Sequence, residues 1–114
     1  MEHYPNHLSP QDYRERAQAR AAHSSSGIGA SVERVVADRD GIPGRSWVCV
    51  VTDGKAVHHL DVRVPDAPDY SGVLTTTVED AVERAAERLP GPDRLAALMA
   101  GGILELDTRD LAGD

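Results

Sequence analysis

The amino-acid sequence predicts an α+β fold, in which a small antiparallel sheet of three to four strands has one amphipathic helix packed on one face and an N-terminal helical arm. Three observations support this class. Two alternating runs of residues flank Asp53-Gly54, a dipeptide that favours tight hairpins because glycine accepts a positive φ. An apolar stripe with helical spacing follows over residues 78–89. All valines and isoleucines lie after Gly27.

Length and composition limit the chain to one modest domain. Its 114 residues include no Phe and one Trp, so Val and Leu must supply most of the core. The shift in composition places this domain at residues 28–106. We expect residues 1–27 to form an arm that is partly helical or flexible, and residues 107–114 to form a frayed tail.

The charge and the single cysteine bear on partners and compartment. A net charge of −7, with no Lys or Arg cluster, makes nucleic acid a poor partner for the chain by itself. It favours solubility or a basic protein partner. One cysteine allows no internal disulfide. No apolar run has the roughly 20 residues of a membrane span, and the first residues lack a signal-peptide pattern, so we expect a cytoplasmic protein.

Residues 9–22 carry the signals of an N-terminal helix. Ser9 is placed to cap it, Pro10 suits the first helical position, and Asp12 follows three residues after the cap. The apolar stripe is thin and consists of Tyr13, Ala17 and Ala21. We therefore expect this helix to lie loosely on the surface or to order on binding.

Residues 30–38 fit either a helix or a strand. Val32, Val35 and Val36 have helical spacing, whereas their β-branched side chains and the Asp40-Gly41 that follows favour a strand. We take the strand as the prediction.

The hairpin around Asp53-Gly54 is the clearest local prediction. A two-residue turn there sets the cross-strand pairs, which are Cys49 with His58, Val50 with Val57, and Trp47 with Leu60. Alternation then assigns the two faces of the sheet. The core face carries Trp47, Cys49, Val51, Ala56, His58, Leu60, Val62 and Val64. The other face carries Ser46, Val48, Val50, Val57, His59, Asp61 and Arg63.

The helix over residues 78–89 is predicted from its ends and its stripe. Thr77 is placed to cap it, with Asp80 three residues later. Asp80 and Arg84 have the spacing of an ion pair, and Pro90 ends the helix. The apolar stripe consists of Val78, Ala81, Val82, Ala85, Ala86 and Leu89.

Shorter elements flank this helix. Residues 71–76 are expected to be extended. Asp93 is placed to cap a short helix that runs through Met99 and stops at Gly101-Gly102. Residues 103–106 then suit a last strand.

Candidate catalytic chemistry is confined to Cys49, His58 and Trp47 on the core face. A thiol beside an imidazole can be a nucleophile or half of a metal site, so a cleft built from these residues is one hypothesis. A buried cysteine next to a hydrogen-bonded histidine explains the same pair without catalysis. His58 and His59 point to opposite faces, and we find no metal-ligand set and no cofactor motif in the sequence.

Two surfaces suit a protein partner. The second sheet face has an apolar patch that needs a cover, which the N-terminal helix, a second subunit or another protein could supply. The predicted interaction patch consists of Val48, Val50, Val57, His59 and Tyr13. The helix over residues 78–89 also has an acidic row that is either solvated or meets a basic partner, and this row comprises Glu79, Glu83 and Glu87.

The run Val64-Pro65-Asp66-Ala67-Pro68, followed by the helix start Thr77-Val78-Glu79-Asp80-Ala81, resembles the HicB-type antitoxin domain. The resemblance covers residues 47–89. It implies a hairpin, a third strand and a helix in that order, together with oligomerisation and binding to a small toxin protein.

These observations favour a non-catalytic protein-interaction module that forms homo-oligomers. Its specific version is an antitoxin-like or immunity-like inhibitor of a partner protein. Two alternatives stay open. One is a small ligand-binding protein or enzyme that uses the cleft of Cys49 and His58. The other is a subunit of a larger assembly, docked through the N-terminal arm.

Overall fold

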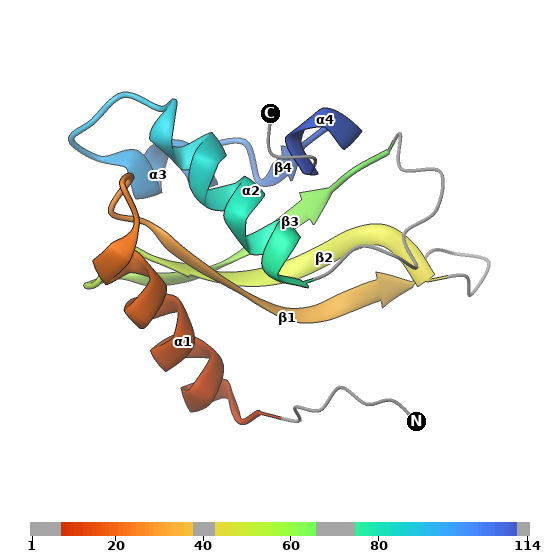
Figure 1. Ribbon diagram of the computed structural model, residues 1–114, viewed down its shortest axis with the longest axis horizontal. Coiled ribbons are helices and arrows are strands. Elements are labelled where there is room, and N and C mark those ends of the chain that lie inside the picture. Colours follow the sequence, from red (N-terminus) through yellow and green to blue (C-terminus); the bar gives the residue numbers. More distant parts are fainter. Residues whose placement is uncertain (1–7, 38–42, 66–74, 112–114) are drawn as a thin grey trace.

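The computed structural model describes residues 8–37, 43–65 and 75–111, and it confirms the α+β class (Figure 1). Its elements in chain order are α1 (Pro10–His23), β1 (Gly29–Ala37), β2 (Pro43–Thr52), β3 (Val57–Arg63), α2 (Thr75–Glu87), α3 (Arg94–Met99), β4 (Ile103–Glu105) and α4 (Thr108–Leu111). The spatial order of the strands is β1-β2-β3-β4. The first three strands are antiparallel as predicted, whereas β4 pairs with β3 in parallel. No helix in the described ranges is long and apolar enough to cross a membrane.

Helix α2 packs on the predicted core face of the sheet. Its stripe is buried or half-buried as expected. The helix begins at Thr75, so the prediction of a Thr77 cap was wrong and the last two residues of the expected extended segment are helical. Residues 71–74 lie outside the described ranges. The buried cluster under α2 includes Ile28, Val32, Trp47, Cys49, Val51, Leu60, Val62, Val64, Val78, Val82, Leu95 and Leu98.

The hairpin between β2 and β3 has a register two residues away from the predicted one. Thr52 pairs with Val57, which leaves a four-residue loop. Side chains stabilise this longer loop, because the Thr52 hydroxyl donates to the Ala56 carbonyl at 2.6 Å and the Asp53 carboxylate accepts two backbone N–H groups. These contacts lower the pKa of Asp53. A shift of two residues keeps the side chains of β2 and β3 on their predicted faces, so most of the predicted core is buried although the pairs were wrong. The prediction failed for Ala56, which lies in the loop, and for His58 beside the loop, because both side chains are exposed.

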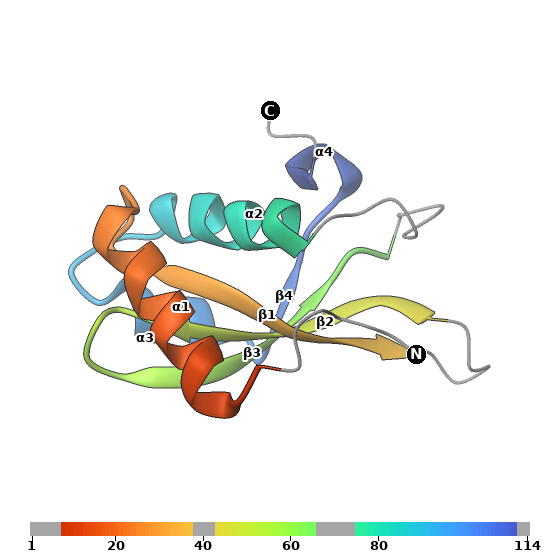
Figure 2. The same cartoon turned by 60° about the horizontal axis from the view of Figure 1, so that its bottom comes forward.

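Helix α1 begins as predicted, with a complete capping box between Ser9 and Asp12. It lies on the opposite side of β1 from α2 (Figures 1 and 2). Ala17 is fully buried, and a Cβ atom on Gly29 would come within 2.0 Å of the Ala17 carbonyl oxygen. Glycine at this position therefore allows the close approach of helix and strand. The expectation of a loosely attached helix was wrong.

The C-terminal elements follow the predicted order. Asp93 caps α3 through the Ala96 N–H, and Gly102 adopts a positive φ of 79° before β4. The frayed tail expected from residue 107 is instead a helical turn, α4, through Leu111. Arg84 donates to the carbonyl oxygen of Asp110 in α4. Arg84 therefore does not form the predicted ion pair with Asp80, which pairs with Arg20 of α1 instead.

Candidate functional site

The structure does not assemble the cleft predicted from Cys49, His58 and Trp47. Cys49 is fully buried and lies opposite Leu60, whereas His58 is exposed. Burial, together with the nearby charge of Glu79, raises the pKa of the Cys49 thiol, so the thiolate needed for nucleophilic chemistry is disfavoured. Trp47 belongs to the core. Within the described ranges, no group of three His, Cys, Asp or Glu side chains is arranged to hold a metal ion.

A buried carboxylate joins α1, β1 and α2. Glu79 of α2 is 1% exposed. Its carboxylate accepts hydrogen bonds from both the Nη2 and Nε atoms of Arg16, at 2.6 and 3.3 Å, and from the backbone N–H of Val32 at 2.7 Å. Arg20 approaches the same carboxylate at 3.5 Å. The charge of Glu79 is thus compensated on burial, as a buried carboxylate requires.

A second set of contacts repeats this arrangement one helical turn along. Glu83 accepts from Arg20 at 2.7 Å and from the backbone N–H of Ala30 at 3.1 Å. Arg20 also pairs with Asp80 at 2.5 Å. Partial burial of Arg20 lowers its pKa, but its bonds to Glu83 and Asp80 outweigh that effect and raise it. We call this whole set of contacts the helix clamp. It joins Glu79, Asp80 and Glu83 of α2 to Arg16 and Arg20 of α1 and to the backbone N–H groups of Ala30 and Val32 in β1.

The helix clamp satisfies backbone groups of an edge strand and also attaches α1 to the sheet. Strand β1 is an edge of the sheet, and an unpaired edge leaves backbone N–H groups free to bind other chains. Glu79 and Glu83 accept two of these N–H groups, while the arginines hold α1 against the edge. The acidic row predicted on α2 is therefore mostly not solvated, because only Glu87 is exposed. The basic surface that it meets belongs to helix α1 of the same chain.

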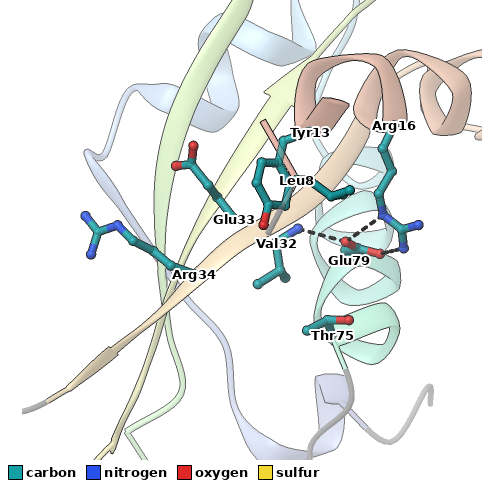
Figure 3. A pocket seen from close by; sticks show the side chains of 8 residues that line it. All are labelled: Leu8, Tyr13, Arg16, Val32, Glu33, Arg34, Thr75 and Glu79. Carbon is teal, nitrogen blue, oxygen red and sulfur yellow. Dashed lines mark hydrogen bonds and ion pairs between the residues drawn. The ribbon is translucent and has the colours of Figure 1, made fainter. Parts of the chain in front are cut away.

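A small hollow of about 170 Å³ lies at one end of the clamp (Figure 3). It forms where a β-bulge interrupts the pairing of β1 between Val32 and Arg34. The bulged residue, Glu33, lies 3.5 Å from the ring of His59 on β3. The lining residues are Leu8, Tyr13, Arg16, Val32, Glu33, Arg34, Thr75 and Glu79. Because Glu79, Arg16 and Glu33 already have partners, a ligand in this hollow would compete with the clamp.

The sheet face away from α2 is covered over only part of its length. Paired residues of neighbouring strands form rows of side chains across this face. In the rows nearest the β2–β3 loop, Ser31 of β1 and Val50 and Thr52 of β2 are buried. Helix α1 contacts both of these strands. Farther from that loop, two rows carry five exposed side chains, which are Arg34, Asp61, Arg63, Ile103 and Glu105. One row is Arg34, Val48, Asp61 and Ile103, and the next is Val36, Ser46, Arg63 and Glu105.

We call these eight residues the open face. It contains a hollow of about 260 Å³ with Val48 at its base. Ile103 is 47% exposed, and among the described residues only Leu8, at 40%, is another exposed large apolar side chain. The four charged side chains of the open face, Arg34, Asp61, Arg63 and Glu105, have no ion-pair partner within residues 8–37, 43–65 and 75–111. A surface with exposed apolar area beside unpaired charges is suited to a partner.

The predicted interaction patch is divided by this arrangement. Val50 is 3% exposed and belongs to the covered rows, and Val57 is half-buried. His59 contacts Glu33, and Tyr13 lines the small hollow. Val48 alone is part of the open face. The alternation of β3 already placed Asp61 and Arg63 on this face, but the sequence did not reveal that Ile103 lies beside them, because the neighbour of the last strand was unknown.

No family model, no curated protein and no solved structure matches this chain. The function therefore has to be inferred from the geometry of the described residues.

Proposed function

We propose that this protein is a non-catalytic protein-interaction module that binds its partner on the open face. The observation that carries the proposal is the position of Ile103. This large apolar side chain is 47% exposed and borders a hollow that is flanked by charged side chains with no ion-pair partner among the described residues. Full burial of an exposed isoleucine contributes about 1.5–3 kcal/mol, and about half of this remains to be gained when a partner covers Ile103. The charges around it can give specificity.

The geometry gives less support to the two alternative functions. A catalytic cleft would need Cys49 accessible to a substrate, and this side chain is fully buried. An assembly docked through the N-terminal arm would need a free α1, whereas Arg16 and Arg20 hold this helix to α2. Docking that used the arginine face of α1 would therefore first break the helix clamp.

An inhibitor of the antitoxin or immunity kind is the specific version of this proposal. The resemblance to HicB-type domains supports it, although much of the turn that carries the resemblance, residues 66–74, lies outside the described ranges. A net charge of −7 would speed the approach of a basic partner. A cytoplasmic location, expected from the single cysteine, is part of the same proposal.

Two matched variants test the proposed function. Ile103→Asp places a charge on the open face, whereas Leu8→Asp makes the similar change at the other exposed apolar side chain. Tagged wild-type protein and both variants are incubated with an extract of the source cells, and the retained proteins are compared, the untagged chain included. We expect Ile103→Asp to reduce retention of the specific partner at least about tenfold and Leu8→Asp to preserve it.

Thermal unfolding shows whether both variants are folded. Retention of the same proteins, in the same amounts, by folded Ile103→Asp and by the wild type would refute the proposed function.

A further inference from the structure

The charges of the open face have an arrangement that points to one kind of partner. Asp61 and Arg63 lie two residues apart on β3, and both are exposed on the same face. Arg34 lies in the row of Asp61, and Glu105 lies in the row of Arg63. With two arginines and two acids, this surface is neutral, although the chain as a whole carries −7. A surface shaped for a strongly basic or acidic partner would carry net charge of the opposite sign, so the charges of the open face itself do not favour the basic partner of the antitoxin-like version.

We infer that the open face binds a second copy of this chain about a two-fold axis that crosses the strands between the two rows. This inference rests on the proposed function and names its partner. Such an axis exchanges the rows, so Asp61 of each copy meets Arg63 of the other. A two-fold contact repeats every interaction, and one residue pair on β3 therefore supplies two ion pairs. Ile103 of each copy then packs beside the Glu105 side chain of the other.

Because the open face has no net charge, two acidic copies of the chain can approach each other there. Two chains of charge −7 repel each other at most orientations, whereas the neutral open face adds no repulsion at the contact. Neither Asp61 nor Arg63 has an ion-pair partner within the described chain. The contact therefore breaks no existing ion pair of either side chain.

The size of the open face sets the strength of the contact. Four strands about 4.8 Å apart and two rows about 6.8 Å apart give a face smaller than the roughly 800 Å² per partner of a standard interface. We therefore expect a weak dimer with a Kd on the order of 100 μM.

Charge reversal at these two positions tests the inference. Sedimentation velocity is measured from about 10 μM to about 1 mM, which brackets the expected Kd. The samples are the wild type, Asp61→Arg, Arg63→Asp and an equimolar mixture of the two variants. Each variant alone places like charges opposite each other twice, and we expect its Kd to rise at least about tenfold. In the mixture opposite charges meet again, and we expect a Kd within about threefold of the wild-type value.

Glu87→Arg is the matched control, because it makes the same change of net charge as Asp61→Arg at an exposed position on α2. Asp61→Arg reduces the net negative charge, so general repulsion between copies would predict stronger association, whereas the proposed contact predicts weaker association. Thermal unfolding confirms that each variant is folded, and the mixture carries no substitution that its two components lack.

The outcomes separate this inference from the proposed function. A wild type that stays monomeric up to about 1 mM, or single variants that associate like the wild type, would overturn the second copy as partner. So would a mixture that stays monomeric while the wild type dimerises. If retention of another protein still depends on Ile103 in any of these cases, the proposed function stands. If no retained protein depends on Ile103 and the wild type also stays monomeric up to about 1 mM, both proposals fail.

Discussion

Glu79→Ala removes the carboxylate on which the helix clamp is centred. The substitution leaves the backbone N–H of Val32 without its acceptor and deprives Arg16 of both its hydrogen bonds to α2. Arg20 loses one contact but keeps its bonds to Glu83 and Asp80. The variant therefore tests whether a single buried carboxylate holds α1 and the edge of the sheet together.

The expected cost follows from how far each partner is exposed. An unsatisfied N–H group at Val32, which is 8% exposed, costs about 1–3 kcal/mol. The side chains of Arg16 and Arg20 are 41% and 23% exposed, so water replaces much of what they lose and their part is about 0.5–1 kcal/mol. We expect Glu79→Ala to lower the free energy of unfolding by about 2–3 kcal/mol, which corresponds to roughly 10 °C in Tm.

Urea unfolding measures the change, with Glu87→Ala as the matched control on the exposed end of the same acidic row. We expect the control to change the free energy of unfolding by less than about 0.5 kcal/mol. Hydrogen exchange at the Val32 amide gives a local measurement, since this N–H should lose protection in Glu79→Ala. Equal costs for the two variants, with an unchanged Val32 amide, would refute the clamp.

Three further substitutions and conditions test the packing. Ser31→Ala should raise the free energy of unfolding by about 1 kcal/mol in urea, because the buried Ser31 hydroxyl has no hydrogen-bond partner among the described residues; a loss of stability would show that the hydroxyl has a role. Gly29→Ala should lower it by about 2 kcal/mol or more, since the new Cβ meets the backbone of α1, and an unchanged urea midpoint would contradict the close approach. The raised pKa of Cys49 keeps the folded thiol neutral, so stability should fall as pH rises above the ordinary value of 9.0, where the unfolded thiol ionises first. Iodoacetamide at pH 9 should accordingly label Cys49 far more slowly than a free thiol, in proportion to the fraction of molecules in which the site is open; labelling at the rate of a free thiol would refute the burial.

Local signals in the sequence were sufficient for most elements of the fold. Ser9 and Asp12 mark the start of α1, and the stripe from Val78 to Ala86 identifies α2, because caps and periodicity act over a few residues. The hairpin register was missed because Thr52 and Asp53 stabilise a longer loop with their side chains. The turn dipeptide alone does not reveal this.

Contacts between distant segments were beyond local reasoning. Arg16 and Arg20 lie four residues apart, as do Glu79 and Glu83, and matched spacing of opposite charges on two helices was the available signal for the clamp. No spacing rule shows that the pairs, 63 residues apart in sequence, face each other. The open face could not be predicted without the pairing of β4 with β3, and this pairing depends on the packing of the whole chain.

The most direct test of the central claim is an NMR titration that maps where the protein meets its partner. Isotope-labelled protein is titrated with unlabelled protein, and with any partner whose retention depends on Ile103. We predict that the amide shifts change mainly on the open face, at residues 61–63 and 103–105, and little on the exposed side of α2. Shift changes centred on Glu87 and its neighbours, with an unperturbed open face, would contradict the account.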